Sequence, residues 1–323
     1  MTNYTNTPNR RIVILTVTES CNLNCVYCYE KSKTKREMSI EKAKEIISYE
    51  FENSPTFDEI EIDLFGGEPT LRKKFIKEIV EWVKTSKFKK PFIFYIDTNG
   101  TLIKGEFKEW LLKNKEYVWV GLSLDGTPES HNKNRSNSYS SIDIPFFIEN
   151  YPGQSVRMTI NNSTVKNLSK DIIHLHTLGF SEVTATFANG INWDFELIKE
   201  DLISEIKKLI DFYTENPKLK PCSIFDMKLP EILNQNVPIS KWCGCGTNMV
   251  SYTTDGISYP CHTFQPNTSG CNELVNIDFD SINDFNDIEC RSCLIERICS
   301  NCYGLNLNER NNILSRDKRM CGI

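Results

Sequence analysis

The chain has 323 residues, of which 39% are hydrophobic, 25% charged and 11% aromatic. This composition is that of an ordinary globular protein and excludes a disordered, collagen-like or coiled-coil chain. The net charge of −5 leaves no global basic surface for nucleic acid or an anionic membrane. Residues 1–10 are polar and no apolar run could span a bilayer, so we expect no signal peptide, no membrane segment and a cytoplasmic location.

Strand-like and helix-like segments alternate along the first part of the chain. The expected strands are β-branched or aromatic-rich and lie at 11–18, 59–65, 91–98, 117–124, 155–160 and 182–187. Helical spacing fills the gaps, beginning with Ser39 as an N-cap and continuing at 71–84, 107–114, 141–150 and 167–178. Six successive βα units predict an α/β fold with a parallel sheet, for which a doubly wound sheet and a barrel both remain open.

The 13 cysteines are unevenly distributed and divide the chain into regions. Three lie at positions 21, 25 and 28, none lies at 29–221, and ten follow from Cys222 onward. An odd number in a long chain without a signal peptide favours metal or cluster ligation over a disulfide framework. We expect a core domain at 1–192, a helix at 193–216 with a Pro-punctuated linker to 242, and a small cysteine-rich domain at 243–323. Metal cross-links would replace a large apolar core there.

The first cysteines form the pattern Cys21-x3-Cys25-x2-Cys28 directly after the first expected strand. Three thiolates on one loop can hold three corners of a cubane iron–sulfur cluster and leave the fourth iron open to a small molecule. A zinc site is the alternative, but it requires a fourth ligand, and the nearest histidine is His131. In a parallel barrel this loop lies at the carboxyl ends of the strands, where such folds place active sites.

With Tyr27 before its third cysteine, this motif resembles the radical S-adenosylmethionine (SAM) superfamily. The resemblance implies a partial (β/α)6 TIM-like barrel whose 4Fe–4S cluster binds SAM through the open iron. It also implies that an electron from the cluster cleaves SAM to methionine and a 5′-deoxyadenosyl radical, which abstracts a substrate hydrogen. The peptide carbonyl of Tyr27 is then a candidate adenine contact.

Three further segments resemble SAM-binding segments of this family. Phe65-Gly-Gly-Glu-Pro69 is similar to the family's GGEP segment, although a plain strand-to-helix turn with Pro69 near helix position N1 is the alternative. The resemblance implies SAM contacts from Gly66, Gly67, Glu68, Pro69, Asn99, Ser123, Asp125 and Arg135. Ser123 and Asp125, two residues apart on one face of a strand, would bind the ribose hydroxyls. An arginine in a loop, such as Arg135, is often simply solvated.

An alternation of acids and aliphatic residues marks the second strand. Glu59, Glu61 and Asp63 alternate with apolar residues, so one set faces the barrel interior. If the acids face inward, the lumen is polar, Asp63 lies nearest the catalytic rim, and Arg157 could compensate one acid. An internal salt bridge without a chemical role is the alternative, because a buried carboxylate needs a partner.

The C-terminal cysteines resemble the SPASM extension of radical SAM peptide and protein maturases. The pattern runs Cys243-x12-Gly256-x4-Cys261, Cys290-x2-Cys293-x5-Cys299-x2-Cys302 and Cys321, and Asp255-Gly256 is a hairpin signal. The resemblance implies two auxiliary 4Fe–4S clusters. Cys290, Cys293, Cys299 and Cys321 would hold the distal one; Cys243, Cys261 and Cys302 the proximal one, with Cys245, Cys271 or an open site as the fourth position. The last spacing is x2 where the family more often has x3, and a zinc ribbon is the alternative.

The resemblance indicates an enzyme that makes a carbon-centred radical on a precursor peptide or protein. Thioether formation, carbon–carbon cross-linking, side-chain oxidation and epimerisation remain open, and Cys222, outside the cluster motifs, is a candidate hydrogen donor or a structural thiol. An anaerobic sulfatase maturase that makes formylglycine is a second hypothesis. A zinc or iron–sulfur electron-transfer module without catalysis is a third.

Two kinds of partner follow from this chemistry. The enzyme would need a reductant such as flavodoxin or ferredoxin. Only ten residues precede the first expected strand, so we expect no N-terminal leader-binding domain and consider a separate leader-binding protein.

Overall fold

The computed structural model describes residues 9–30, 32–225, 243–269, 277–279, 287–293, 295, 296, 299 and 302–321. Strands β1 (Arg10–Thr18), β2 (Glu59–Gly66), β3 (Phe92–Thr98) and β4 (Val118–Leu122) form one parallel sheet in the order β4-β3-β2-β1. Strands β5 (Val156–Ile160) and β6 (Val183–Phe187) pair in parallel, and β5 joins β4 through the Leu124 N–H, which donates to Arg157 O at 2.9 Å. Each strand therefore lies beside its sequence neighbours, without the order reversal of a doubly wound sheet.

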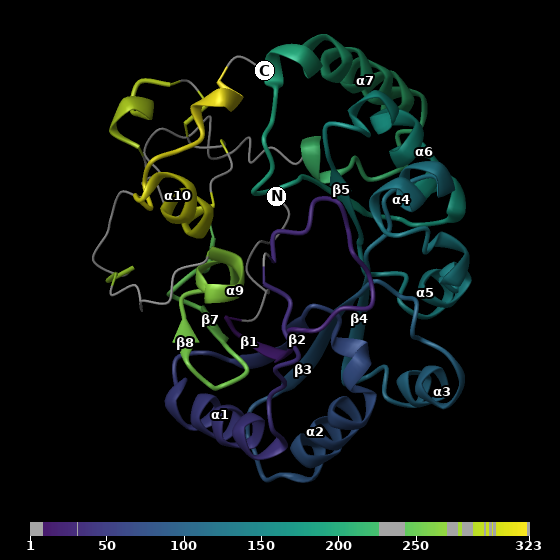
Figure 1. Ribbon diagram of the computed structural model, residues 1–323. Coiled ribbons are helices and arrows are strands. Elements are labelled where there is room, and N and C mark those ends of the chain that lie inside the picture. Colours follow the sequence, from purple (N-terminus) through teal and green to yellow (C-terminus); the bar gives the residue numbers. More distant parts are fainter. Residues whose placement is uncertain are drawn as a thin grey trace.

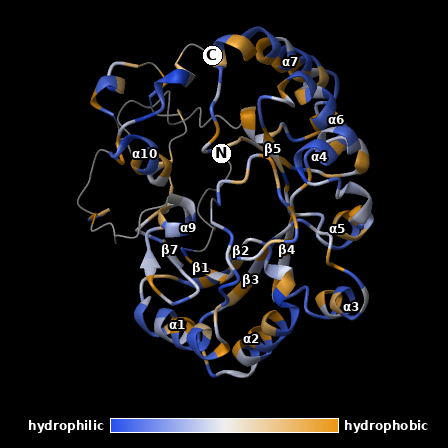
Figure 2. Ribbon diagram, viewed as in Figure 1, coloured by the Kyte–Doolittle hydropathy of each residue, from blue (hydrophilic) through white to orange (hydrophobic). Residues whose placement is uncertain are grey.

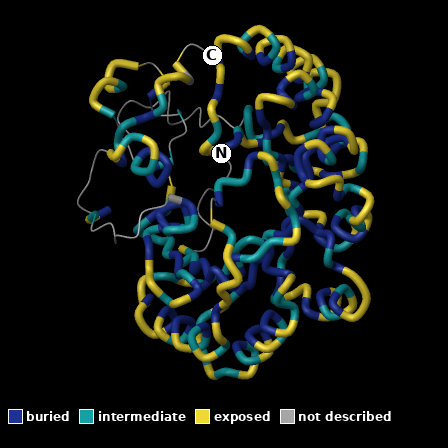
Figure 3. The backbone as a smooth tube through the Cα atoms, in the orientation of Figure 1, coloured by how far each residue is buried: buried dark blue, intermediate teal, exposed yellow. Residues whose placement is uncertain are grey.

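Helices cover the outer side of this curved sheet (Figure 1). Their bounds are α1 Ile40–Asn53, α2 Lys73–Thr85, α3 Gly105–Lys113, α4 Pro128–Asn134, α5 Ile144–Asn150, α6 Leu168–Leu178 and α7 Phe195–Glu215. Short 3-10 turns occupy Pro69–Arg72, Tyr139–Ser141, Val165–Asn167 and Ser223–Phe225. The arrangement confirms the predicted α/β class with a partial TIM-like barrel. In Figure 3 exposed segments gather on the outer turns of the helices, and the strands are mostly buried or intermediate.

The local signals explain several boundaries. The Ser39 side chain accepts from the Lys42 N–H and caps α1, as predicted. Gly179 ends α6 at φ 113°, a left-handed conformation that glycine adopts without strain. Helix α4 was not among the predicted helices; Thr127 caps it and Pro128 stands in its first turn.

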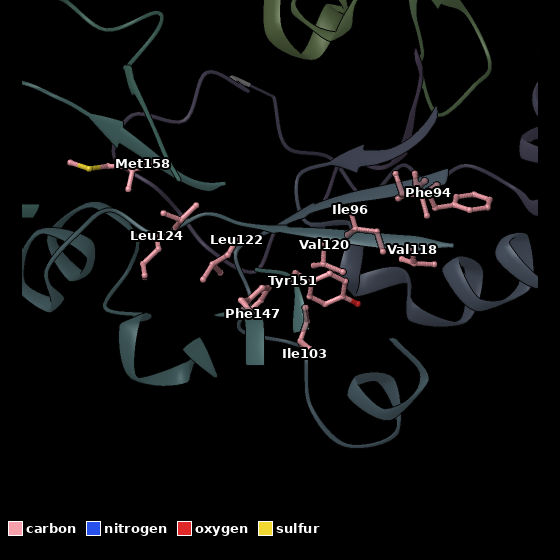
Figure 4. Packing of buried hydrophobic residues seen from close by; sticks show 14 of the residues in the cluster. Phe94, Ile96, Ile103, Val118, Val120, Leu122, Leu124, Phe147, Tyr151 and Met158 are labelled. Carbon is pink, nitrogen blue, oxygen red and sulfur yellow. The ribbon is translucent and has the colours of Figure 1, made fainter. Parts of the chain in front are cut away.

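The hydrophobic core lies between the outer face of the strands and the helices. Ile60, Ile62 and Leu64 of β2 are fully buried there, so the alternating acids of this strand face the lumen. Figure 4 shows Val118, Val120 and Leu122 of β4 beside Phe147 and Tyr151, which belong to α5 and its C-cap, and Ile103. The hydropathy colouring of Figure 2 shows hydrophobic and hydrophilic residues alternating around the covering helices, as expected for amphipathic helices on a sheet.

The C-terminal cysteine-rich segment contributes two strands to the same sheet. Strand β7 (Met249–Tyr252) pairs in parallel with β1, and β8 (Ser258–Tyr259) pairs antiparallel with β7. Gly256 lies in the hairpin between them at φ 83°, in agreement with the predicted turn. The remaining described elements are α9 (Pro266–Ser269), α10 (Tyr303–Arg310) and the 3-10 turns His262–Phe264, Ile288–Cys290 and Lys318–Met320. A second, small hydrophobic cluster forms around Phe264 and Tyr303 and includes Cys245 and Cys261.

Candidate active site

A cavity of about 500 Å³ opens where the cysteine loop crosses the barrel lumen. The loop follows β1, so the parallel sheet carries it to the carboxyl edge of the strands. Cys21, Cys25 and Cys28 all line this cavity. The other predicted SAM-site residues that line it are Tyr27, Gly66, Gly67, Glu68, Asn99, Ser123 and Arg135. Pro69, Asp125 and Cys222 are not among the lining residues.

The three thiols form a donor set that suits a thiophilic metal cluster. Burial raises the pKa of Cys21 to about 11 and also raises the pKa of Cys25, and each of these thiols lies within the electrostatic reach of another cysteine of the loop. The Leu23 N–H donates to Cys21 Sγ at 3.4 Å. Thiolates in this place therefore require a strong cationic partner, and a cluster supplies one iron to each sulfur. Among the described residues, no group of three or more His, Cys, Asp or Glu side chains is close enough together to bind a single metal ion.

The two glycines after β2 allow the cysteine loop to pass close to this strand. Gly66 has φ 138°, and a Cβ there would lie 2.0 Å from Thr18 O. A Cβ on Gly67 would lie 2.4 Å from Ser20 O and 3.0 Å from the Cys21 N. The Gly67 N–H donates to Thr18 O at 3.0 Å, and the Glu68 N–H donates to Ser20 O at 2.9 Å. The glycines thus permit a backbone–backbone contact that fixes the loop beside the cavity.

Glu68 joins the ends of β2 and β3. Its Oε1 accepts from Thr70 N at 3.0 Å, Thr70 Oγ1 at 2.5 Å and Thr98 Oγ1 at 2.7 Å. Its Oε2 accepts from Asn99 N at 2.8 Å, and the side chain is buried. It also caps the 3-10 turn that begins at Pro69, so the turn that the sequence offered as an alternative is present within the cavity wall. The predicted contact of Glu68 with SAM stays a prediction.

Asp125 lies behind the cavity and holds two of its walls in place. Its Oδ2 accepts from Tyr27 Oη at 2.5 Å and from Asn134 Nδ2 at 3.0 Å, while its Oδ1 accepts from Thr159 N at 3.0 Å. Arg135 Nε lies 3.1 Å from Oδ1 and its guanidinium lies over the Tyr27 ring. Arg135 is therefore buried and paired, not solvated as loop arginines often are. Asp125 is fully buried, so its predicted ribose contact stays a prediction.

The lumen carries charged residues that the sequence only partly indicated. Glu61 and Asp63 line the cavity, and so does Arg157, but Arg157 pairs with Asp97 at 2.6 Å. Arg10 pairs with Glu59 at 2.9 Å and with Glu61. The acids of β2 thus face inward, as one of the two predicted arrangements has it. Asp63 is the acid of β2 nearest the carboxyl end of the strand, as predicted, and Phe65 follows it in the cavity lining.

Tyr29, Glu30 and His262 also line the cavity and were not predicted as site residues. Glu30 is 7% exposed, and burial raises its pKa to about 7. His262, from the C-terminal segment, lies with its ring centroid 4.7 Å from that of Phe65 and 6.0 Å from that of Tyr29. Burial lowers the pKa of His262 to about 4. The only local signal for His262 is its position after Cys261.

Four C-terminal cysteines meet around Thr263. Cys261 Sγ lies 2.9 Å from Thr263 Oγ1, and Cys302 Sγ lies 3.8 Å from the same oxygen. The Cys245 thiol hydrogen bonds to Cys243 and Cys261, which raises the pKa of Cys245 and lowers that of Cys261. The structure therefore brings Cys245 to the three residues predicted for the proximal cluster, and Cys271 lies outside the described residues.

The predicted distal set lies in the last part of the chain. Cys299 and Cys321 are both within electrostatic reach of Cys290 and contribute to the raised pKa of its thiol, after burial and Asp287. The Cys293 N–H donates to Cys290 O at 2.9 Å, so Cys290 and Cys293 lie in one turn of the chain. Cys293 and Cys321 are exposed.

Cys222 belongs to the hydrophobic core instead of the cavity. It is fully buried, and its N–H donates to the Tyr213 hydroxyl of α7 at 2.9 Å. Ser223 beside it exchanges hydrogen bonds with the backbone of Ala185 in β6. The structure does not bring Cys222 to the three loop cysteines, and burial raises its pKa.

A family model described as "Radical SAM superfamily" matches residues 15–143, which include the cysteine loop and the ends of β2 to β4. Residues 15–143 match a radical SAM domain. The chain's relatives named as maturating enzymes indicate an enzyme, and this family uses a 4Fe–4S cluster together with SAM.

Two curated relatives illustrate the extent of the similarity. The uncharacterized protein MJ0907 of Methanocaldococcus jannaschii is 37% identical over 115 residues, which are 35% of this chain and only 38% of that relative. The cysteine-type anaerobic sulfatase-maturating enzyme of Clostridium perfringens is 26% identical over 290 residues, which are 79% of this chain and 74% of the relative. The second similarity therefore extends beyond the radical SAM domain into the cysteine-rich segment.

Solved structures share the fold over nearly the whole chain. The structure of anSMEcpe with bound AdoMet and the Cp18Cys peptide has a TM-score of 0.74 at 20% identity and covers 95% of this chain and 93% of that one. Streptococcus suis SuiB bound to its precursor peptide SuiA has a TM-score of 0.64 at 19% identity, with 96% and 75% covered. At these identities the likeness shows the fold alone, and it extends over nearly the whole chain.

None of the helices in the described part of the chain is long and apolar enough to cross a membrane.

Proposed function

We propose that this protein is a radical SAM enzyme that modifies a ribosomally made peptide or a protein. The observation that carries the proposal is the meeting of Cys21, Cys25 and Cys28 on one cavity with the glycine-lined end of β2. When bound there, a 4Fe–4S cluster supplies the electron that cleaves SAM to methionine and a 5′-deoxyadenosyl radical. The similarity to peptide-bound structures supports a peptide substrate.

The chain's own residues position and shield this chemistry. Cys21, Cys25 and Cys28 would hold the cluster, while Gly66, Gly67 and Glu68 line the same cavity and Pro69 begins the turn that follows them. Tyr27, Asn99, Ser123 and Arg135 are the candidates for contacts with SAM, and Asp125 holds Tyr27 and Arg135 in place. Placement within the barrel lumen would limit the access of water and protect a reactive intermediate.

We also propose two auxiliary 4Fe–4S clusters in the domain at 243–323. Cys243, Cys245, Cys261 and Cys302 would hold the proximal one, because the structure gathers these four side chains. Cys290, Cys293, Cys299 and Cys321 would hold the distal one. Such clusters suit oxidative outcomes, since the product radical then has an electron acceptor within the same protein.

The test is anaerobic reconstitution followed by reduction with dithionite in the presence of SAM. We expect a brown protein that releases 5′-deoxyadenosine, and a Cys21/Cys25/Cys28→Ser variant that releases none. This variant should lose about a third of the bound iron if the auxiliary clusters remain. A colourless protein, or one that leaves SAM intact, would refute the proposal. Bound zinc in place of iron would favour the third hypothesis, a zinc module without catalysis.

An anaerobic sulfatase maturase is the second candidate, because the Clostridium perfringens relative covers 79% of this chain. Incubation with a sulfatase-derived peptide containing the target Cys or Ser separates the two functions. Formylglycine, read as a defined mass loss, supports the sulfatase candidate. A cross-link or an epimer in a short precursor peptide supports peptide maturation.

The remaining partners follow from the same chemistry. We propose flavodoxin or ferredoxin as the reductant in the cell and a separate leader-binding protein for the precursor. We also propose a cytoplasmic location, because a reducing compartment keeps cluster-binding cysteines from forming disulfides. Cys222 as a hydrogen donor for epimerisation finds no support in its core position. Unchanged D-residue yield in Cys222→Ala would eliminate that role.

A further inference from the structure

The carboxylates around the cavity fall into two kinds. Glu68 and Asp125 are saturated by donors of the chain itself: four hydrogen bonds reach the first, and three hydrogen bonds and an ion pair reach the second. Glu30 Oε1, Asp63 Oδ1 and Asp97 Oδ1 are buried oxygens without a hydrogen-bond partner within the described residues, and all three side chains line the cavity. Asp63 and Asp97 also have carboxyl contacts of their own, with Glu61 and Tyr95 respectively. Buried acceptors without donors are costly, so a ligand that brings donors would account for them.

The arginines of the lumen are paired with carboxylates, and the cavity-lining Lys33 donates to Leu23 O at 3.0 Å. Arg157 pairs with Asp97 Oδ2, Arg10 with Glu59 and Glu61, and Arg135 with Asp125. Asp63 has no ion pair among the described residues, and the charges of Glu61 and Asp97 act on it from either side. Burial and these two acids raise the pKa of Asp63 well above its usual value. Among the residues that line the cavity, five acidic side chains (Glu30, Glu61, Asp63, Glu68 and Asp97) stand against three cationic ones (Lys33, Arg135 and Arg157).

Asp63 lies deeper in the lumen than the glycines at the end of β2. Asp63 precedes Gly66 by three residues on β2, which corresponds to about 10 Å along a strand. The register sets Asp63 beside Ile14 of β1 and Tyr95 of β3, and Asp97 follows two residues later on β3. The glycines and the cysteine loop lie at the other, upper end of this wall.

Glu30 provides an independent indication of a ligand. Glu30 lies on the cysteine loop and not on a strand. Only 7% of the residue is exposed, and its Oε1 has no hydrogen-bond partner among the described residues although the side chain lines the cavity. Tyr29 beside it is within electrostatic reach of both Glu30 and Asp97, so the loop and the strands present their acids to one space.

We propose that the lumen binds a cationic side chain, lysine or arginine, of the peptide substrate, and that the unpaired carboxylate oxygens of Asp63, Asp97 and Glu30 receive it. This inference rests on the proposed function for the identity of the substrate as a peptide. It adds the chemical class of the residue that enters beside the radical. An ammonium or guanidinium group supplies several donors and the missing positive charge at once.

The test uses SAM-loaded, anaerobically reconstituted full-length enzyme and three acetylated, amidated pentapeptides, Ala-Ala-Xaa-Ala-Ala, with lysine, norleucine or glutamate at the centre. Norleucine keeps the length of lysine and lacks the charge. We expect the lysine peptide to bind about tenfold more tightly than the norleucine peptide by calorimetry, with the glutamate peptide weakest. Asp63→Asn should reduce this preference to about twofold, and Asp211→Asn, an exposed carboxylate on α7, should preserve it.

Equal binding of the lysine and norleucine peptides to the wild-type enzyme would overturn the inference without any variant. A lysine preference that survives in Asp63→Asn would overturn it as well. The inference would also fail if Asp63→Asn weakened the binding of SAM but left the binding of all three peptides unchanged. Release of 5′-deoxyadenosine is measured on the same wild-type preparation. If the wild type cleaves SAM but ignores charge, only the inference fails; if it binds lysine selectively but leaves SAM intact, only the proposed function fails.

Discussion

At the scale of single residues, the site depends on buried polar side chains that make hydrogen bonds within the protein. Glu68 and His131 are the clearest cases, because both are almost fully buried and both join segments that wall the cavity. Their roles can be tested by stability measurements that do not depend on knowing the substrate.

Replacement of Glu68 should cost stability as well as any ligand contact. In Glu68→Ala the donors Thr70 N, Thr98 Oγ1 and Asn99 N lose their acceptor inside the protein. We expect the free energy of unfolding to fall by about 3 kcal/mol, measured by urea denaturation under anaerobic conditions. The matched control is Glu81→Ala on α2, an exposed residue paired with Lys84, with an expected loss of about 0.5 kcal/mol or less. Unchanged stability with weakened SAM binding would show that Glu68 serves the ligand alone.

His131 should make the protein sensitive to mild acid. Asp125 N donates to its Nδ1 at 3.2 Å, Ser138 Oγ lies 3.0 Å from its Nε2, and burial lowers the pKa to about 4. The unfolded chain takes up the proton first, so stability is lost as the pH falls from about 6.5 towards the folded pKa.

This difference predicts a loss of about 2 kcal/mol between pH 7 and pH 5 from this residue alone. Denaturation curves at the two pH values measure it. His131→Gln should reduce the pH dependence by this amount, whereas His174→Gln, at the partly exposed contact with Tyr139, should leave it as in the wild type. Equal slopes in all three proteins would contradict the assignment.

At the scale of elements, the end of β2 and the cysteine loop fit together only through glycine. In Gly67→Ala the new Cβ would lie 2.4 Å from Ser20 O, so the loop that carries Cys21 must move. We expect reconstituted Gly67→Ala to lose most of the SAM-cleaving cluster, seen as reduced iron content and loss of 5′-deoxyadenosine release.

The control for this prediction is Gly153→Ala, where a Cβ would meet nothing within 4 Å. It should reconstitute as the wild type does. Normal iron content and activity in Gly67→Ala would show that the loop tolerates the displacement and that the glycine serves another purpose.

Sequence patterns predicted the regular elements because each has a local cause. The period-2 strands, the Ser39 cap and the Gly179 terminus all lie within a few residues of the predicted positions. The cysteine loop, too, could be predicted, since its ligands are contiguous. Asp97 and His262 could not, because their places in the cavity depend on strand register and on a return of the chain from residue 249 onward. Helix α4 has only seven residues, too few for a clear period.

At the scale of the whole molecule, the cysteine-rich segment is built onto the barrel and not merely tethered to it. Strand β7 extends the sheet at β1, and the Ile12 N–H donates to Asn248 O at 2.7 Å. Gln265 links Thr16 of β1, at 2.9 Å, with Ser251 of β7, at 2.6 Å. This attachment brings His262 into the cavity and places Cys261 directly before the turn that carries His262.

Glu50 of α1 is the central polar contact of this attachment. It is 3% exposed at the side chain and accepts from Arg11 Nε at 2.9 Å and from Tyr252 Oη at 2.5 Å. Arg11 Nη1 in turn donates to Thr247 O at 2.8 Å, so one carboxylate joins α1, β1 and β7. Removing it would leave the partly buried Arg11 without its counter-charge.

We therefore expect Glu50→Ala to lower the free energy of unfolding by about 3–5 kcal/mol and Tyr252→Phe by about 1 kcal/mol. The exposed Glu45, paired with Lys42, provides the control, and Glu45→Ala should cost less than about 1 kcal/mol. Hydrogen exchange resolves where the loss falls: protection of β7 should drop further than that of β3 in Glu50→Ala. If β3 and β7 lose protection equally, the attachment and the barrel unfold as one unit, and Glu50 stabilises the whole sheet instead of the junction.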